Sequence, residues 1–260
     1  MNLHLNKISE HIVTWLSDYC DKAKVSGFVI GISGGVDSAL TSLLCAKTNK
    51  KVILLSMPIR QTTKEFQRAN DHIEDLKNRF PNVISFEINL TDSFAQLEKD
   101  FTSSVVSNHL AMANSRARLR MLTLYAYGQA NNCLVVGTGN KVEDFGVGFY
   151  TKYGDGGVDI SPIADLTKSQ VWELARYVGV INSIIVAKPT DGLFEDERSD
   201  EDQIGATYPE LEWAMNFDQN ESELSERETE VLKIYRRLNT SNRHKMEPIP
   251  VCKIPIQYLS

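Results

Sequence analysis

Apolar residues in the first half of the chain follow two alternating patterns. Short apolar runs with β-branched residues predict buried strands over 27–32, 52–57, 83–88 and 133–136. Between these runs, apolar residues recur at helical spacing and predict helices over 5–19, 39–47, 64–77 and 109–130. This alternation is typical of βαβ units, so the expected fold class is α/β: a doubly wound, mostly parallel sheet flanked by helices.

The last hundred residues have a different pattern. Capping-box sequences at Thr167 and Ser225 predict one helix through 178 and another over 231–238. Between Asp191 and Glu230 there are 15 acidic residues and only two arginines, and 191–202 has few core-forming residues. We expect 191–202 to be a mobile loop. Because no convincing linker interrupts the chain, we expect one domain over 1–260 with a helical C-terminal part.

Composition excludes several classes of protein. The chain is 42% hydrophobic and 24% charged, and its net charge of −6 argues against nucleic-acid binding. Its apolar runs are far shorter than the roughly 18 residues of a membrane span. No secretory signal is visible, and the four cysteines form no CxxC pair, which argues against a zinc site or a disulfide scaffold. We therefore expect a cytoplasmic protein that binds neither nucleic acid nor membrane.

The strongest local signal is the run Ser33-Gly34-Gly35-Val36-Asp37-Ser38, between a predicted strand and a predicted helix. Glycines let backbone N–H groups approach an anion, and a helix N-terminus adds its positive dipole end. The two serines add hydroxyl donors, and Asp37 is suited to a magnesium ion that bridges phosphates. A Walker A loop is excluded, because no lysine stands in the required place. A plain tight turn remains the alternative.

A second polar stretch follows the fourth predicted strand. Thr138 provides a hydroxyl at the strand end, and Glu143 provides a carboxylate suited to magnesium. Lys152 is a cation beside a Gly-Asp-Gly-Gly turn, and Asp155 and Asp159 are further carboxylates at loop spacing. From the residues alone, a solvated loop with turn residues remains possible.

These two stretches resemble a known family. The run Ser-Gly-Gly-Val-Asp-Ser is similar to the pyrophosphate loop of the N-type ATP pyrophosphatases, which several ligase families share. The run 151–157, Thr-Lys-Tyr-Gly-Asp-Gly-Gly, resembles a signature of the NAD synthetases. Segments 114–121, 189–193 and 200–205 and the pair His244-Lys245 also follow that family's order. The resemblance extends from Gly31 to Lys245 and implies a fold like that of the adenine nucleotide alpha hydrolases.

The resemblance implies a role for each matching residue. ATP would contact Gly31, Ile32, Ser33, Gly34, Gly35, Val36, Asp37, Ser38, Thr138, Lys168 and Thr190, and magnesium would bind Asp37 and Glu143. Deamido-NAD (nicotinic acid adenine dinucleotide) would contact Arg118, Lys152, Asp159, His244 and Lys245. The catalytic residues would be Asp155, Lys168 and Lys152, with Asp155 placed where ammonia must arrive.

The implied reaction is the last step of NAD biosynthesis. ATP adenylates the carboxylate of deamido-NAD with release of pyrophosphate, and ammonia then replaces AMP to give NAD. Only 26 residues precede Gly27, too few for the glutaminase domain of glutamine-dependent relatives, so free ammonia is the expected donor. The resemblance also implies a homodimer. We further expect the acidic loop 191–202 to order over the bound nucleotide and shield the adenylate from water.

Two departures and two alternatives remain. One residue more than in the family pattern separates Glu143 from Lys152, and segment 57–62, expected near adenine, matches only loosely. Another ATP-pyrophosphatase ligase, such as one that modifies tRNA, would require a basic patch or a nucleic-acid module. A non-catalytic nucleotide-binding module would not require Glu143, Lys152 and Asp155 together.

Overall fold

The computed structural model describes residues 3–61, 63–189 and 199–259. Its strands are β1 (Gly27–Gly31), β2 (Lys51–Ser56), β3 (Val83–Glu87) and β4 (Cys133–Val135). Its first helices are α1 (Leu5–Ala23), α2 (Val36–Ala46), α3 (Thr63–Arg79), α4 (Thr91–Asp100), α5 (Ser103–Val106) and α6 (His109–Asn131). The later ones are α7 (Lys168–Val178), α8 (Asn182–Ile185), α9 (Asp200–Ile204), α10 (Tyr208–Met215) and α11 (Glu226–Met246). A π-helical turn, η1 (Val142–Val147), and two 3₁₀ turns, η2 (Glu221–Glu223) and η3 (Ile256–Tyr258), complete the order.

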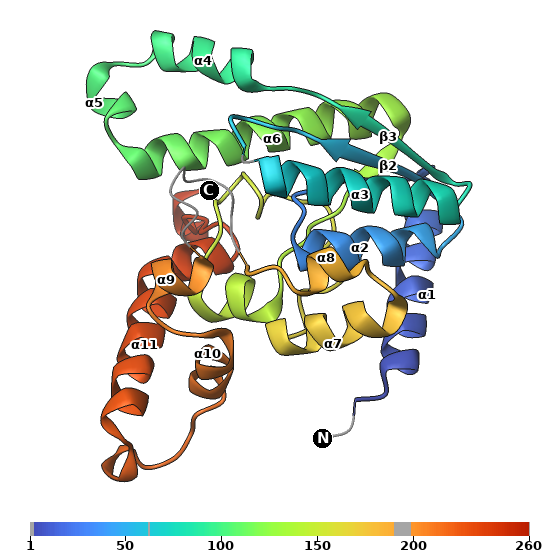
Figure 1. Cartoon of the computed structure of the whole chain (residues 1–260). Coiled ribbons are helices and arrows are strands. Elements are labelled where there is room, and N and C mark those ends of the chain that lie inside the picture. Colours follow the sequence, from blue (N-terminus) through green and yellow to red (C-terminus); the bar gives the residue numbers. More distant parts are fainter. Residues whose placement is uncertain (1–2, 62, 190–198, 260) are drawn as a thin grey trace.

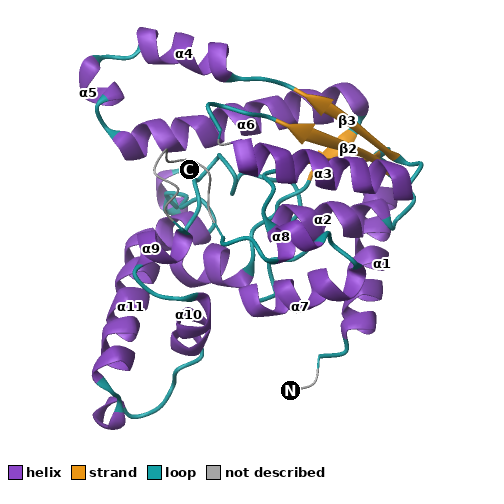
Figure 2. Cartoon of the chain, in the orientation of Figure 1, coloured by secondary structure: helices purple, strands orange, loops and turns teal. Residues whose placement is uncertain are grey.

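The described strands form one parallel sheet in the order β3-β2-β1-β4 (Figure 2). Strand β1 is central: Gly27 aligns with Lys51 of β2 and with Cys133 of β4. The chain moves outward from β1 through β2 to β3 and then returns to the other side of β1. The strand order therefore reverses between β1 and β4, and ligands of such sheets bind at the carboxyl ends beside this reversal.

Side chains of the strands alternate between two apolar layers, as the sequence predicts for a sheet covered on both faces. Phe28, Ile30 and Leu54 pack with α1, α2, α3 and α7 in one core cluster. Val29 and Ile53, on the opposite face, pack with α4 and α6 in a second cluster (Figure 1). This arrangement confirms the doubly wound α/β fold.

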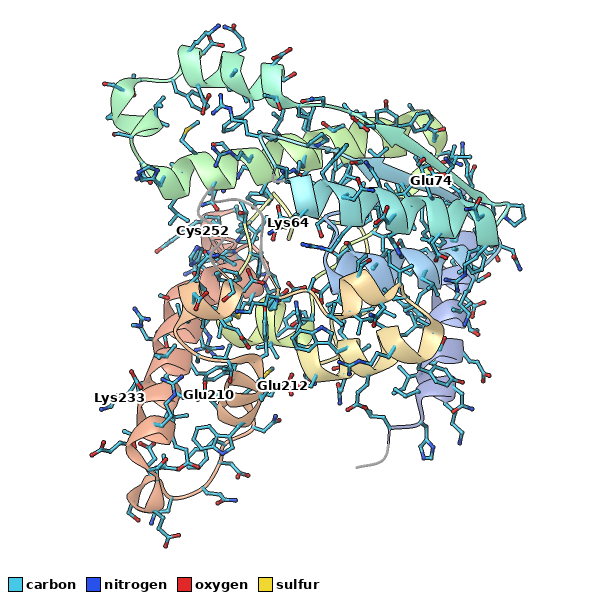
Figure 3. The ribbon with its side chains drawn as sticks, in the orientation of Figure 1. Lys64, Glu74, Glu210, Glu212, Lys233 and Cys252 are labelled. Carbon is cyan, nitrogen blue, oxygen red and sulfur yellow. The ribbon has the colours of Figure 1, made fainter. Side chains whose placement is uncertain are left out.

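A third cluster lies beside the sheet and is built by η1, α9, α10 and α11. We call these four elements the C-terminal block; Figure 1 labels its helices α9, α10 and α11 in orange to red. Figure 3 labels Glu210, Glu212 and Lys233 on its helices. Ser169 at the start of α7 donates its backbone N–H to Glu212 Oε1 at 2.8 Å, which ties the block to the sheet domain.

Most predicted elements are confirmed, with shifted ends. Helix α2 begins at Val36 and not at 39, so half of the glycine-rich run already belongs to its first turn. The helix predicted over 231–238 extends to Met246 as α11, which places His244 and Lys245 on its last turn. Both predicted capping boxes, at Thr167 and Ser225, are present.

The prediction of a mobile loop over 191–202 is wrong for residues 200–202. Asp200–Ile204 form helix α9, because the Ser199 side chain caps the Asp202 backbone N–H and Asp202 reciprocates. Asp200 is buried, although its acidic neighbours predicted exposure. The rest of that prediction lies outside the described residues, and so does Thr190. Within the described ranges, no helix is both long enough and apolar enough to cross a membrane.

Candidate active site

The loop between β1 and α2 is held by its own serines. Ser38 Oγ donates to the Gly35 carbonyl at 3.1 Å, and the two hydroxyl oxygens of Ser33 and Ser38 lie 3.0 Å apart. Gly34 has φ +86, and a Cβ there would lie 2.7 Å from the Glu65 carbonyl oxygen, so only glycine fits without strain. The N–H groups in the first turn of a helix have no intrahelical partner. The loop and α2 together therefore form a site suited to anions.

This loop lines a cavity of about 250 Å³ at the carboxyl ends of β1 and β4. Most of the residues predicted to bind ATP or magnesium, or to act in catalysis, meet there. Those that line the cavity are Gly31, Ile32, Ser33, Gly35, Val36, Asp37, Ser38, Thr138, Glu143, Asp155 and Lys168. The structure therefore joins two sequence stretches that lie about a hundred positions apart.

A buried ion cluster occupies the centre of this cavity wall. Lys168 Nζ lies 2.6 Å from Asp37 Oδ2 and 3.0 Å from Glu143 Oε1, and its side chain is only 3% exposed. Burial by itself would lower the pKa of Lys168, but the Asp37 and Glu143 carboxylates more than offset this and raise it. Lys168 therefore remains a cation between the two carboxylates.

Asn140 connects the Asp37 carboxylate to the backbone at the start of η1. It is fully buried, and its Nδ2 donates to Asp37 Oδ1 at 3.2 Å. Its Oδ1 accepts the backbone N–H groups of Val142 and Glu143 at 3.1 and 3.2 Å. Asn140 thus fixes the start of η1 relative to the loop after β1.

The segment between Glu143 and Lys152 begins in the π-helical turn η1. A π turn incorporates one residue more than an α turn, and such turns occur frequently at functional sites. Three side chains of α11 bind its carbonyl end: Asn239 donates to Gly146, Asn242 to Val147, and Lys245 to Gly148. These contacts hold the end of η1, and Glu143 near its start lines the cavity.

Two further carboxylates lie near Glu143 in the cavity wall. Asp155 Oδ1 accepts the Thr151 backbone N–H at 3.0 Å, and the loss of solvation raises the pKa of Asp155. The loss of solvation is the largest cause that raises the pKa of Asp144, and the negative charges of Glu143, Asp155 and Asp37 raise it further. Together they raise the pKa of Asp144 to about 8. The cavity is therefore strongly acidic around one buried lysine.

The residues predicted to bind the dinucleotide form a separate chain of contacts outside this cavity wall. Arg118 Nε donates to the Lys152 carbonyl at 3.3 Å, and Lys152 Nζ donates to the His244 carbonyl at 2.6 Å. Lys245 Nζ donates to the Tyr150 carbonyl at 2.8 Å, and Tyr150 lines the cavity. These cations therefore lie next to the cavity and are held by the backbone of segment 148–152 and of α11.

Asp159 is placed differently. Its Oδ2 accepts the Val135 backbone N–H at 2.8 Å, and its Oδ1 lies 3.1 Å from the Tyr125 hydroxyl. These contacts tie the carboxylate to the end of β4 and to α6. Its binding role stays a prediction.

Four residues of the site go beyond those that the motifs predict: Asn140, Asp144, Asp200 and Tyr208. Asn140 and Asp144 stand inside the run that carries Glu143, so their position was the available signal. Asp200 belongs to the segment 191–202 that we expect over the bound nucleotide, whereas nothing in the local pattern of Tyr208 points to the cavity. The Tyr208 hydroxyl reaches Glu143 and Asp200 only because of the tertiary fold.

Comparison with known proteins identifies a matching family model, similar sequences and similar solved structures. The family model described as NAD synthase matches residues 8–249. The NH(3)-dependent NAD(+) synthetase of Mycoplasma genitalium is 37% identical over 217 residues, which cover 83% of this chain and 85% of that protein. The protein of the same name from Carboxydothermus hydrogenoformans is 34% identical and covers 94% and 96%, respectively. The solved structure of NMN synthetase from Francisella tularensis superposes with a TM-score of 0.86 at 32% identity, covering 97% of this chain and 100% of that one.

Proposed function

Because the chain belongs to the NAD synthase family, we propose that it is a ligase that converts deamido-NAD to NAD with ATP and ammonia. The observation that carries this proposal is the buried Lys168 between Asp37 and Glu143, beside an anion-binding loop. A site that only held a nucleotide would not need this arrangement of charges next to Asp155.

The first step joins two anions, so the site must supply positive charge. The substrate carboxylate attacks the α-phosphorus of ATP, an acyl-adenylate forms, and pyrophosphate leaves. Backbone N–H groups of the loop at 33–38 and the ammonium group of Lys168 are placed to stabilise the charge that develops on the phosphates. Adenylation turns the carboxylate oxygen into part of a good leaving group.

Magnesium fits the donors at the cavity. Proteins commonly bind this ion through one or two carboxylates together with substrate phosphates. Asp37 and Glu143 already share one cation, the Lys168 ammonium, so their oxygens suit a positive partner. Among the described residues no group of three or more His, Cys, Asp or Glu side chains forms a self-sufficient metal site. Asp37 and Glu143 would hold magnesium together with ATP, and the ion would neutralise phosphate charge.

The second step requires ammonia without its extra proton. Asp155 lies in the cavity wall, and its raised pKa makes it a better proton acceptor than an ordinary carboxylate. We assign to Asp155 the proton that ammonium loses before its nitrogen attacks the acyl carbon. The products are the amide and AMP.

We assign the binding of deamido-NAD to the cations next to the cavity. Arg118, Lys152 and Lys245 offer positive charge to the pyrophosphate and carboxylate of deamido-NAD, with His244 beside them on α11. Asp159 and Thr190 keep the binding roles that the family resemblance implies for them.

We assign the oligomeric state and the cellular compartment from the same family relationship. We assign a homodimer, which is supported by large exposed apolar side chains on α6: Leu110 and Leu122 are 64% and 66% exposed. We assign the chain to the cytoplasm, in keeping with the free thiols of Cys20, Cys45, Cys133 and Cys252. Sedimentation equilibrium should give twice the monomer mass of 29.3 kDa.

A second candidate substrate comes from the Francisella tularensis structure, whose name is NMN synthetase. Its similarity covers the whole described fold, so nicotinic acid mononucleotide must be tested beside the dinucleotide. The same chemistry would amidate either carboxylate, and only the contacts of the remaining part of the substrate differ.

The test measures pyrophosphate release by the purified protein with ATP and magnesium. Deamido-NAD and nicotinic acid mononucleotide are supplied in turn, each with ammonium or glutamine, while the amide product is followed separately. We expect pyrophosphate and NAD to appear together with deamido-NAD and ammonium. A higher kcat/KM for the mononucleotide would assign the chain to the second activity.

A further inference from the structure

Tyr208 connects the C-terminal block to the ion cluster of the cavity. It is the first residue of α10 and is fully buried. Its hydroxyl lies 2.5 Å from Glu143 Oε1 and 3.2 Å from Asp200 Oδ2. Its ring lies 4.7 Å from Lys168 Nζ and packs edge-on against Trp172.

Because of these contacts, the two carboxylate oxygens of Glu143 have different surroundings. Oε1 receives both the Tyr208 hydroxyl and the Lys168 ammonium. Oε2 makes no hydrogen bond to any residue of the described ranges, and Glu143 lines the cavity. One carboxylate oxygen is therefore fixed by the protein, and the other remains available to a cation brought by the substrate.

The position of Tyr208 itself depends on α9. Its backbone N–H donates to Glu201 Oε1 at 2.9 Å, and Asp200 contacts its hydroxyl. The Asp200 backbone N–H donates to the Pro189 carbonyl at 3.1 Å, and both residues line the cavity. Tyr208 thus joins Glu143 to the chain that returns to the cavity at Asp200.

We propose that Tyr208 is a positioning residue for the reaction: its hydroxyl fixes Glu143 Oε1 so that Oε2 faces the metal–ATP complex in a set orientation. This inference rests on the proposed function, because it concerns the magnesium that Asp37 and Glu143 would hold. Tyr208 acts through Glu143 and touches neither substrate.

The decisive variant is Tyr208→Phe, which removes one oxygen and keeps the ring. Hydrogen bonds to charged groups are stronger than those between neutral groups. Loss of this one should therefore weaken metal affinity about tenfold. Binding is measured without turnover, by electron paramagnetic resonance of Mn²⁺ in the presence of a non-hydrolysable ATP analogue. In steady-state assays, the magnesium concentration for half-maximal rate should rise about tenfold, with a smaller change in kcat at saturating magnesium.

The matched control is Tyr235→Phe on α11. Tyr235 packs against the same apolar cluster, and its hydroxyl makes no hydrogen bond within the described part of the chain. This control should leave Mn²⁺ affinity unchanged. Equal Mn²⁺ affinities for Tyr208→Phe and the wild type would overturn the inference, whatever happens to stability.

A second measurement applies even if the phenylalanine variant folds poorly. Tyr208→3-fluorotyrosine keeps the ring and hydroxyl, and its ¹⁹F resonance should shift when magnesium and the ATP analogue are added. An unchanged resonance on saturation would overturn the inference and leave the proposed function intact. A wild-type protein that binds the analogue but no Mn²⁺ would instead contradict the magnesium assignment, and the inference with it.

Discussion

The two sides of the cavity are built in different ways. The loop after β1 comes from six consecutive residues, which pack on a central strand and hydrogen-bond mainly to one another. The opposite side draws on η1, α9, α10 and α11, which are more than a hundred positions away from that loop. A local motif thus specifies the proposed phosphate site, whereas the C-terminal block is specified by packing between distant segments.

Helix α7 is the element that joins the two sides. Val171 and Leu174 belong to the core beneath the β1 loop, while Trp172 also packs against the cluster of the C-terminal block. Lys168, at the start of this helix, binds Asp37 from one side and Glu143 from the other. Changes at Lys168 should therefore affect both sides of the cavity.

Lys168→Met should have the largest effect. It leaves Asp37 and Glu143 without their shared cation, and breaking a buried ion pair costs about 3–5 kcal/mol of unfolding free energy. Loss of a preorganised positive group should also lower kcat by about 10²–10³-fold. Urea unfolding and pyrophosphate release measure the two effects. Lys141→Met is the control, because Lys141 pairs at the surface with Asp165. A kcat within tenfold of wild type for Lys168→Met would contradict the account.

Gly34→Ala should damage the ATP side alone. The residue has φ +86, and the new Cβ would meet the Glu65 carbonyl at 2.7 Å, so the loop must move. We expect a loss of about 2–3 kcal/mol in unfolding free energy and a higher KM for ATP. The KM for deamido-NAD should stay near the wild-type value, and an equal rise in both constants would remove the distinction between the two sides.

Gly148→Ala should produce the converse result. Here φ is +64, and a Cβ would lie 2.4 Å from Asn242 Cβ and 2.8 Å from Met246 Cε. Helix α11 must then move away from η1, which disturbs Lys245. We expect a higher KM for deamido-NAD with little change for ATP. Gly146→Ala is the matched control, since its Cβ would make only ordinary contact, 3.5 Å from Met215 Sδ.

His72→Gln should weaken the pH dependence of stability in acid. His72 of α3 is fully buried, its Nε2 lies 2.9 Å from Ser42 Oγ, and loss of solvation lowers its pKa to about 4. The unfolded chain gains this proton near pH 6.5, so the stability contribution of His72 is lost as pH falls from 6.5 towards 4. Protonation of this group should lower the free energy of unfolding of the wild type by about 2 kcal/mol between pH 7.5 and 5.

The measurement for this prediction is urea unfolding at both pH values. The glutamine variant should show a correspondingly smaller decline, with unchanged activity at neutral pH. His109→Gln, at an exposed position on α6, should keep the wild-type pH dependence. A decline of the same size in His72→Gln and wild type would show that other groups control the acid limb.

The sequence predicts the sheet side of the molecule well, since strands and helices there follow local periodicity. It also singles out the loop at 33–38, Lys168 and Glu143, which line one cavity, because these stand in contiguous motifs. It fails for α9, where charge density suggested an exposed loop, and for Tyr208, whose contact with Glu143 spans 65 positions. It also does not predict the π turn η1, whose carbonyl end is bound by side chains of α11.

We propose that the two sides of the cavity together drive ATP-dependent amidation of deamido-NAD. The most direct measurement is single-turnover analysis of the purified protein with ATP, magnesium, deamido-NAD and ammonium, quantifying pyrophosphate, AMP and NAD. The account predicts equal amounts of all three, with pyrophosphate formed first and NAD absent when ammonium is withheld. Pyrophosphate release that does not depend on deamido-NAD, or NAD formation without AMP, would contradict it.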